Sequence, residues 1–473
     1  MNISTTRRML ALAGRGALVS GLGLGLILGC SNAVSPATNT VTAATASVPV
    51  LITDAPSDQL VSFSLTLNSI TLTDSAGKTA SILSAPATVE ICHLNGIQAP
   101  LVTASIPQDT YTSAVIAFSN PAITYINSSG QPVVASPVLA TTSFTFTFPA
   151  PGFTVNNTST SLLVDLLASQ SVAISGTTVT VTPTFSLKPV PPAATAPPTG
   201  QNGTGMQQDG AVVSSTATTL TIAPGSGPNF TVTTNSSTVL QGFTSLTSLT
   251  AGELVEVDFT VQSGGVYLAS RIALEPAPPG GTMPNLLTGP VTSVASGGFK
   301  MVLMQGLGPA VPVSTSAASV FTVTTTASTT FSITPQFVSL SGLPFTPTFT
   351  AANLSAGQTV GVVASSIAGT TAAATSVYLV PQTLAGTVAA IKTAGNYTAY
   401  TLTLPSASAF GSLSGASTVT VYTSAATAPP PGVTAPPAIA VGSTVRFNGL
   451  VFNLGGGSFS MVAGVCPDGA PGI

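Results

Sequence analysis

The sequence predicts an all-β protein in which an antiparallel β-sandwich is followed by about three small β-barrel modules. Two observations carry this prediction. Apolar residues alternate with Ser and Thr, as at Val61, Phe63, Leu65 and Leu67, and this period of two is typical of half-buried strands. A Gly-containing pattern also recurs three times in the second half of the chain, which indicates repeated modules.

The composition narrows the class of protein further. Only 4% of the 473 residues are charged, against roughly 25% in ordinary globular chains. With 45 Gly, 38 Pro and a net charge of −3, this favours strands with hydroxyl-coated faces over disorder. Nine basic residues form no basic patch, so no nucleic-acid partner is expected. Trp is absent, which weakens the case for a sugar site built on ring stacking.

Residues 1–29 have the features of an export signal, with a basic Arg7-Arg8 pair before an apolar segment. The segment ends in Ile27-Leu28-Gly29-Cys30, which resembles a bacterial lipobox. The resemblance implies cleavage between Gly29 and Cys30, lipidation of Cys30 with fatty acyl chains such as palmitate, and a membrane lipid as partner. An ordinary signal peptide with a chance cysteine remains the alternative, and the choice between general and twin-arginine export stays open.

Residues 30–46 are expected to form a tether. Ser31 follows the lipidated cysteine, as in lipoproteins sent to the outer membrane, so the expected location is the outer membrane, on its periplasmic face or at the cell surface.

Residues 47–190 are predicted to form the sandwich. A shift in the apolar alternation indicates a bulge at Asn68-Ser69, residues 74–77 are expected to turn, and Ser175-Gly176 fits a tight hairpin. The remaining strand candidates are Thr88–Leu94, Tyr111–Phe118, Ser143–Phe148, Ser161–Leu167, Ser171–Ile174 and Thr178–Ser186.

Three segments of this region resemble a bacterial exported family of unknown function. They are residues 53–56 (Thr-Asp-Ala-Pro), 106–111 and 163–166 (Leu-Val-Asp-Leu). The resemblance implies a prealbumin-like or carbohydrate-binding-like sandwich, with no established activity to carry over. The chain departs from the family pattern at Gln108-Asp109, where the family commonly has a small residue and Gly.

A Pro- and Gly-rich linker, residues 191–205, precedes the three repeats, which are expected at 206–276, 286–381 and 382–470. Each repeat opens with a glycine before a Val-containing strand, at Gly210, Gly289 and Gly386. Each later has a second glycine, at Gly252, Gly357 and Gly442, where a turn would use its freedom to adopt positive φ. The pattern resembles a second exported family of unknown function, whose modules are small barrels of five or six strands.

No catalytic residue, metal site or cofactor is predicted. The single histidine, His93, is expected to be a packed, neutral residue in a strand, and G-x-S-x-G, H-E-x-x-H and P-loop motifs are absent from the sequence. With Cys30 lipidated, Cys92 and Cys466 either form a disulfide or stay free, and the sequence leaves this open.

Three carboxylates are the candidate binding residues. Asp54 and Asp58 flank a proline turn and offer oxygens suited to Ca²⁺, although Asp54 is better explained as capping the turn. Asp165 is expected to point outward from its strand; if it points inward, it must be paired. Glu256 and Asp258 share one strand face, which is expected to be solvated.

The main functional hypothesis is therefore a lipid-anchored cell-envelope protein with a non-enzymatic binding or scaffolding role, whose partner is a glycan or an envelope protein. Two alternatives stay open: a glycan-binding surface lipoprotein, and a hydrolase with an atypical site at Asp54, Asp58 and Asp165. Because titratable groups are few, stability is expected to vary little with pH.

Overall fold

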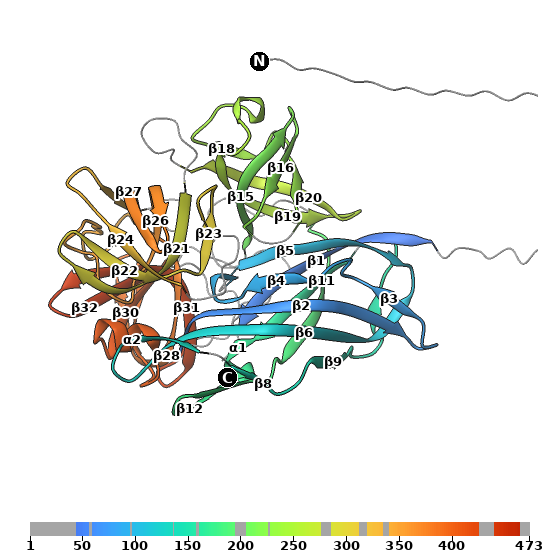
Figure 1. The fold of residues 1–473 in the computed structure, drawn as a ribbon, viewed down its shortest axis with the longest axis horizontal. Coiled ribbons are helices and arrows are strands. Elements are labelled where there is room, and N and C mark those ends of the chain that lie inside the picture. The colour runs from blue at the N-terminus through green and yellow to red at the C-terminus, as the bar shows by residue number, and fades with distance from the viewer. Residues whose placement is uncertain are drawn as a thin grey trace, which may run out of the picture. The chain divides into compact units, whose positions relative to one another are not determined.

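The computed structural model describes residues 44–55, 59–94, 97–135, 137–157, 160–193, 205–225, 228–275, 285–311, 319–333, 340–424 and 439–463 (Figure 1). Nearly all regular structure in them is β-strand, arranged in several sheets and small closed barrels, which confirms the predicted fold class. Within these residues, no helix is long and apolar enough to cross a membrane. Gly29, Cys30, Asp58 and Cys466 lie outside the described residues.

Two sheets form the N-terminal sandwich. The first runs in the order β14 (Phe185–Val190), β11 (Ser161–Leu167), β1 (Thr45–Ala55), β5 (Ile97–Pro107). The second runs β10 (Phe153–Thr154), β6 (Thr110–Ile126), β2 (Leu60–Asp74), β3 (Thr79–Ser81), with β4 (Ala87–Glu90) also on β2, and β7 (Pro132–Ala135) and β9 (Ser143–Thr147) also on β6. A small third sheet joins β12 (Val172–Ser175), β13 (Thr178–Val181) and β8 (Val138–Leu139). Two pairings depart from the antiparallel pattern, because β1 and β11 run parallel and so do β13 and β8.

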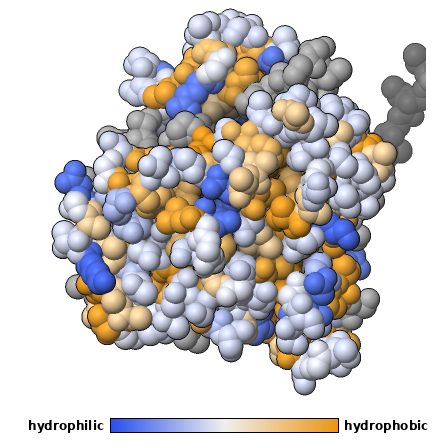
Figure 2. All heavy atoms as spheres, turned by 90° about the vertical axis from the view of Figure 1, so that its left-hand side faces the viewer, coloured by the Kyte–Doolittle hydropathy of each residue, from blue (hydrophilic) through white to orange (hydrophobic). Residues whose placement is uncertain are grey.

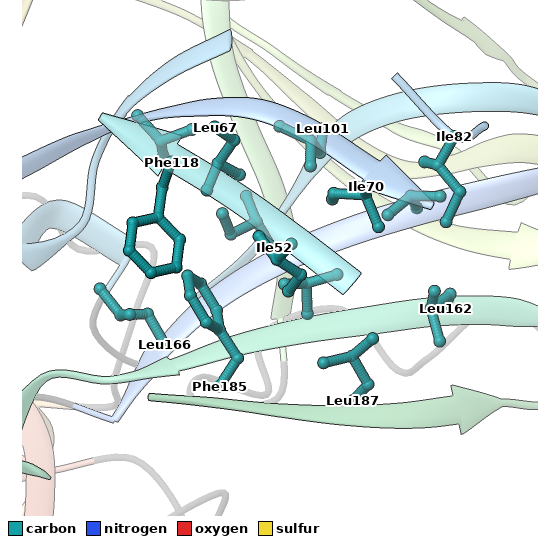
Figure 3. Packing of buried hydrophobic residues seen from close by; sticks show 14 of the residues in the cluster. Ile52, Leu67, Ile70, Ile82, Leu101, Phe118, Leu162, Leu166, Phe185 and Leu187 are labelled. Carbon is teal, nitrogen blue, oxygen red and sulfur yellow. The ribbon is translucent and has the colours of Figure 1, made fainter. Parts of the chain in front are cut away.

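The sandwich core lies between the first two sheets. Figure 3 shows Ile52, Phe118, Leu166 and Phe185 pointing toward one another from strands of both sheets. The rings of Phe118 and Phe185 lie 5.9 Å apart between centroids. Fully burying one such apolar side chain contributes about 1.5–3 kcal/mol, so this shared core holds the two sheets together.

Local features of the sandwich follow the sequence closely, with two exceptions. The expected strand Thr178–Ser186 is divided, because β13 ends at Val181 and β14 begins at Phe185 in another sheet. The pairing of β2 with β6 shifts register between Leu67 and Ser69, which confirms the bulge, and β12 and β13 form the hairpin that turns at Gly176. The expected strand Thr88–Leu94 is wrong in its second half. The strand β4 ends at Glu90, and the 3₁₀ turn η1 (Cys92–Leu94) follows, because Glu90 accepts hydrogen bonds from the amides of Cys92 and His93.

Three modules follow the sandwich, and all three have the same cyclic order of strand pairing. Module one (residues 205–275) joins β15 (Gly205–Ser215), β16 (Thr219–Ala223), β17 (Phe230–Thr233), β20 (Val266–Leu274) and β19 (Leu254–Gln262), with β18 (Val239–Gln241) beside β20. It also contains the 3₁₀ turn η2 (Leu246–Ser248).

Module two (residues 285–379) joins β21 (Asn285–Ala295), β22 (Gly298–Val302), β24 (Val320–Thr324), β27 (Thr371–Leu379) and β26 (Thr359–Ala368), with β23 (Gln305–Leu307) beside β21 and β25 (Thr330–Ile333) beside β27. Module three (residues 382–463) joins β28 (Gln382–Ala394), β29 (Tyr397–Thr403), β30 (Thr418–Ser424), β32 (Ser458–Ala463) and β31 (Thr444–Gly455) in a closed barrel, with the short helix α2 (Ala409–Ser414) between β29 and β30.

The recurring glycines serve two physical purposes. The turn glycines Gly252, Gly357 and Gly442 have φ of 91°, 92° and 90°, a left-handed conformation that other residues rarely adopt. The opening glycines instead leave room for a neighbouring backbone: a Cβ on Gly289 would lie 1.8 Å from the Val302 carbonyl oxygen. Each opening strand then carries a bulge at the same place, which bends it enough to close a small barrel.

The surface reflects the low charge of the chain. Figure 2 shows one face on which apolar and weakly hydrophilic residues are interspersed and strongly hydrophilic ones are sparse. Charged side chains that the fold gathers in one place are therefore conspicuous.

Candidate functional site

A cavity of about 580 Å³ lies between one edge of the sandwich and modules one and two. At this edge, β5 pairs in parallel with β15, so the first sheet of the sandwich continues into module one. The polar residues that line the cavity are Ser64, Thr66, Thr88, Glu90, His93, Asn120, Gln208 and Gln305, and its apolar lining includes Leu94, Leu101 and Met304.

The most specific arrangement in this cavity is the pair formed by Glu90 and His93. Glu90 ends β4, and one oxygen of its carboxylate lies 3.0 Å from His93 Nδ1. The same oxygen accepts the backbone amide of His93. The other oxygen accepts hydrogen bonds from the Ser62 hydroxyl and from the amides of Phe63 and Cys92. The glutamate is thereby fixed, and it fixes the imidazole in turn.

This pair can bind a ligand or exchange a proton with it. Because Nδ1 faces the carboxylate, Nε2 is the nitrogen that remains for a hydrogen bond to a ligand. Among the described residues, His93 bonds to no hydroxyl or thiol that could act as a nucleophile. Cys92 is buried, and burial, followed by the nearby charges of Glu90 and Asp54, raises the pKa of its thiol well above the ordinary value.

Two of the three predicted site residues, Asp54 and Asp165, lie near each other, and Asp54 also lies near Glu90. Asp54 is buried at the end of β1, and its pKa is raised well above the ordinary value by burial first and then by the charges of Asp165 and Glu90. Burial therefore disfavours the charged form of this carboxyl, which makes it a poor calcium ligand. Within the described part of the chain, no three His, Cys, Asp or Glu side chains are placed to hold a metal ion.

Asp165 lies on the strand face opposite the core residues Leu162, Val164 and Leu166, as the alternation of β11 predicts. That face is not open solvent, because one carboxylate oxygen of Asp165 is buried. Neither Asp54 nor Asp165 lines the cavity, whose wall at β1 is formed by Ile52.

A second group of charged residues lies in module one. On β19 and β20, Arg271 bonds to Glu256 through Nη2 and to Asp258 through Nε, the latter at 2.6 Å. Glu256 is 7% exposed and Arg271 is 4% exposed. The expectation that Glu256 lies on a solvated face is therefore wrong, although it does share a face with Asp258, opposite the barrel core. We call Asp209, Glu256, Asp258, Arg271 and Glu275 the Arg271 cluster.

Burial dominates the electrostatics of the Arg271 cluster. It raises the pKa of Asp209 to about 7, with the charge of Glu275 as the next cause. It raises the pKa of Glu256 to about 8 despite the opposing attraction of Arg271, and the pKa of Glu275 to about 7. In contrast to the expectation from composition, these shifts predict that stability varies with pH. Sequence reasoning missed the cluster because it depends on strand register; an arginine in an otherwise apolar strand was the available signal.

One comparison with known proteins concerns this second group. Residues 209–273 match a family described as Domain of unknown function (DUF5666). The matched segment contains Asp209, Glu256, Asp258 and Arg271. No curated protein matches the chain.

Proposed function

We propose that this chain is a lipid-anchored protein of the bacterial cell envelope that binds a neutral, hydroxyl-rich ligand without transforming it. The observation that carries the binding proposal is the carboxylate-oriented imidazole of His93 in the wall of a cavity of about 580 Å³. The anchor rests on the lipobox around Cys30. A glycan chain has the chemistry that this lining favours.

The chemistry of the lining argues for a neutral ligand. Among the described residues that line the cavity, Glu90 alone is acidic, and both its oxygens already accept hydrogen bonds from the protein. Uncharged donors and acceptors at Ser64 and Asn120 also line the cavity and can meet a ligand there. Hydroxyl and amide groups pair well with such side chains. An anionic ligand would meet no Lys or Arg among the described lining residues, and a cationic ligand would have to compete with the protein donors that already bond Glu90.

The same geometry argues for binding over catalysis. Nucleophilic catalysis needs a hydroxyl or thiol within hydrogen-bond reach of its base. In the described residues, the imidazole of His93 is bonded to the Glu90 carboxylate and to no such group. The thiol of Cys92 is buried and does not line the cavity.

Calorimetric titration of the purified full-length chain tests the binding proposal, with cellotetraose, chitotriose and maltotetraose as probes. We expect saturable binding of at least one probe, weakened about tenfold or more by His93→Ala and by Asn120→Ala, which corresponds to about 1.4 kcal/mol. Gln131→Ala, an exposed position that does not line the cavity, is the matched control and should bind as the wild type does. Absence of binding, or binding that His93→Ala leaves unchanged, contradicts the proposal.

The anchor has its own test. The full chain expressed with its signal should partition into the detergent phase of a membrane extract and carry a diacylglyceryl mass at Cys30. Cys30→Ser should move the protein to the aqueous phase. A soluble wild-type chain with an unmodified Cys30 would remove the anchor from the proposal and leave the cavity's role to be judged on its own.

A further inference from the structure

The Arg271 cluster occupies the outer face of module one. Asp209 on β15 is directly opposite Glu256 on β19, and Asp258 is directly opposite Arg271 on β20. Side chains at alternate positions of a strand share a face, so Glu256 and Asp258 lie together, and Glu275 follows the end of β20. Four of the chain's twelve carboxylates thus surround one guanidinium.

Module two covers this face. Leu254 of module one packs with Leu286, Leu307 and Val363 of module two in one apolar cluster. Tyr378 of β27 packs against the same cluster, and its hydroxyl lies 3.4 Å from the Glu275 carboxylate. From β23, Gln305 lies close enough to Asp209 to lower the pKa of its carboxyl, which opposes the effect of burial.

A glycine of module two makes room for the ring of Tyr378. The partner of Tyr378 in the β26–β27 pairing is Gly361, where a Cβ would lie 2.3 Å from the tyrosine ring. The missing side chain lets the ring lie over the strand and reach the Glu275 carboxylate. The contact between modules one and two therefore combines apolar packing around Leu254 with a hydrogen bond from Tyr378 to Glu275, and we call this contact the junction.

We propose that this junction is a proton-operated latch: modules one and two stay docked while Asp209, Glu256 and Glu275 hold protons, and separate when those protons leave. The proposal does not depend on a ligand in the cavity.

The charge balance at the junction gives the physical reason. With all four carboxylates ionised, Arg271 would leave a net charge of −3 at a junction where Glu256 is buried and Asp209, Asp258 and Glu275 are partly buried. Each buried ion costs several kcal/mol unless it is paired, and like charges at this distance repel. The other groups that face the carboxylates are Gln241, Gln305 and Tyr378, which carry no compensating charge.

The direction of the pH effect follows from linkage. A carboxyl exposed to water has a pKa near 4, whereas the docked junction holds these groups at about 7 to 8. A raised pKa in the docked state means that docking is fully favoured below about pH 4 and is lost as the pH rises through those docked values. Tyr378 stays protonated across this range, because burial raises its pKa well above the ordinary value.

Hydroxyl-radical footprinting of the full chain between pH 6 and pH 9 tests the latch. We expect the oxidation rates of Leu286, Leu307 and Tyr378 to rise several-fold on going to pH 9. Met461, which is buried in module three, should stay protected and so separates undocking from global unfolding. Equal oxidation of the junction residues at both pH values overturns the proposal.

A variant gives the second arm of the test. Asp209→Asn, Glu256→Gln and Glu275→Gln together keep the shapes of the side chains and leave Arg271 paired with Asp258. This triple variant should stay protected at pH 9, whereas Asp109→Asn, at an exposed carboxylate of the sandwich, should open as the wild type does. If the triple variant does not fold, Asp209→Asn alone should raise the midpoint pH of opening. If the triple variant, or Asp209→Asn in its place, folds and opens at the same pH as the wild type, the proposal is overturned.

Discussion

Arg271 on β20 lies directly across from Asp258 on β19, and its Nε donates to the Asp258 carboxylate at 2.6 Å. From this position Nη2 of the guanidinium reaches Glu256, which lies two residues before Asp258 on β19. One arginine therefore bonds two carboxylates of a strand whose other face forms the core of module one. In a chain with 4% charged residues, this concentration of charge is the most informative feature of the module.

Removing the guanidinium should destabilise the protein strongly. Arg271→Met removes the ion-pair partner of the Asp258 carboxylate and a hydrogen-bond donor to the buried Glu256 carboxyl. Breaking a fully buried ion pair costs about 3–5 kcal/mol, and we expect a loss toward the lower end of that range because the Asp258 side chain is 29% exposed. Urea unfolding at pH 7 measures the loss. Lys300→Met, at an exposed position of module two, should change the free energy of unfolding by less than about 0.5 kcal/mol. Equal effects of the two substitutions would contradict a structural role for the arginine.

Stability should fall as the pH rises. Asp209, Glu256 and Glu275 bind protons more tightly in the folded chain than in the unfolded chain, so their stabilising effect is complete below about pH 4 and lost as the pH rises through 7 to 8. Between pH 5 and pH 8 the wild type should lose several kcal/mol relative to the triple variant. Melting temperatures measured at each pH check this. Parallel pH profiles for the two proteins would show that these carboxyls do not titrate as inferred.

The opening glycine of module two should not tolerate a side chain. In Gly289→Ala the new Cβ would meet the Val302 carbonyl, so β21 and β22 must separate locally. Gly369→Ala is the comparison, since its Cβ meets nothing and only its positive φ opposes the change, at a cost of about 1–2 kcal/mol. Denaturant unfolding should show the larger loss for Gly289→Ala. A larger loss of unfolding free energy for Gly369→Ala than for Gly289→Ala would mean that β21 and β22 accommodate the new side chain with little cost.

The thiol of Cys92 should be inert in the folded protein. It is buried, and its pKa is raised well above the ordinary value, so the reactive thiolate is scarce. Mass spectrometry of the peptide that carries Cys92 should show little alkylation by iodoacetamide at pH 8 and complete alkylation in denaturant. Rapid labelling of the native chain would contradict the burial.

The sequence predicted the parts of the fold that depend on local pattern. The period of two along β2, the bulge after Leu67 and the glycines of the repeats all follow from residues close together in the chain. The parallel pairing of β1 with β11 could not be predicted in this way, because it joins segments more than a hundred residues apart.

The candidate site was harder to predict for the same reason. His93 was expected in a strand, but the carboxylate of Glu90 ends that strand by binding the amides that follow it. Glu256 was expected to be solvated, since alternation gives the face of a residue but not what covers that face. Arg271 comes to it from β20 and Asp209 lies opposite it on β15, and only the register of these strands places them.

We infer that carboxyls of the Arg271 cluster hold protons at neutral pH. Infrared titration of the protonated-carboxyl band from pH 5 to pH 9, taken as the difference between the wild type and the triple variant, tests it most directly. The structure predicts a difference band that persists at pH 6 and disappears between about pH 7 and pH 8. A difference band already absent at pH 6 would show that the buried carboxylates are ionised, and would contradict both the pH profile and the latch.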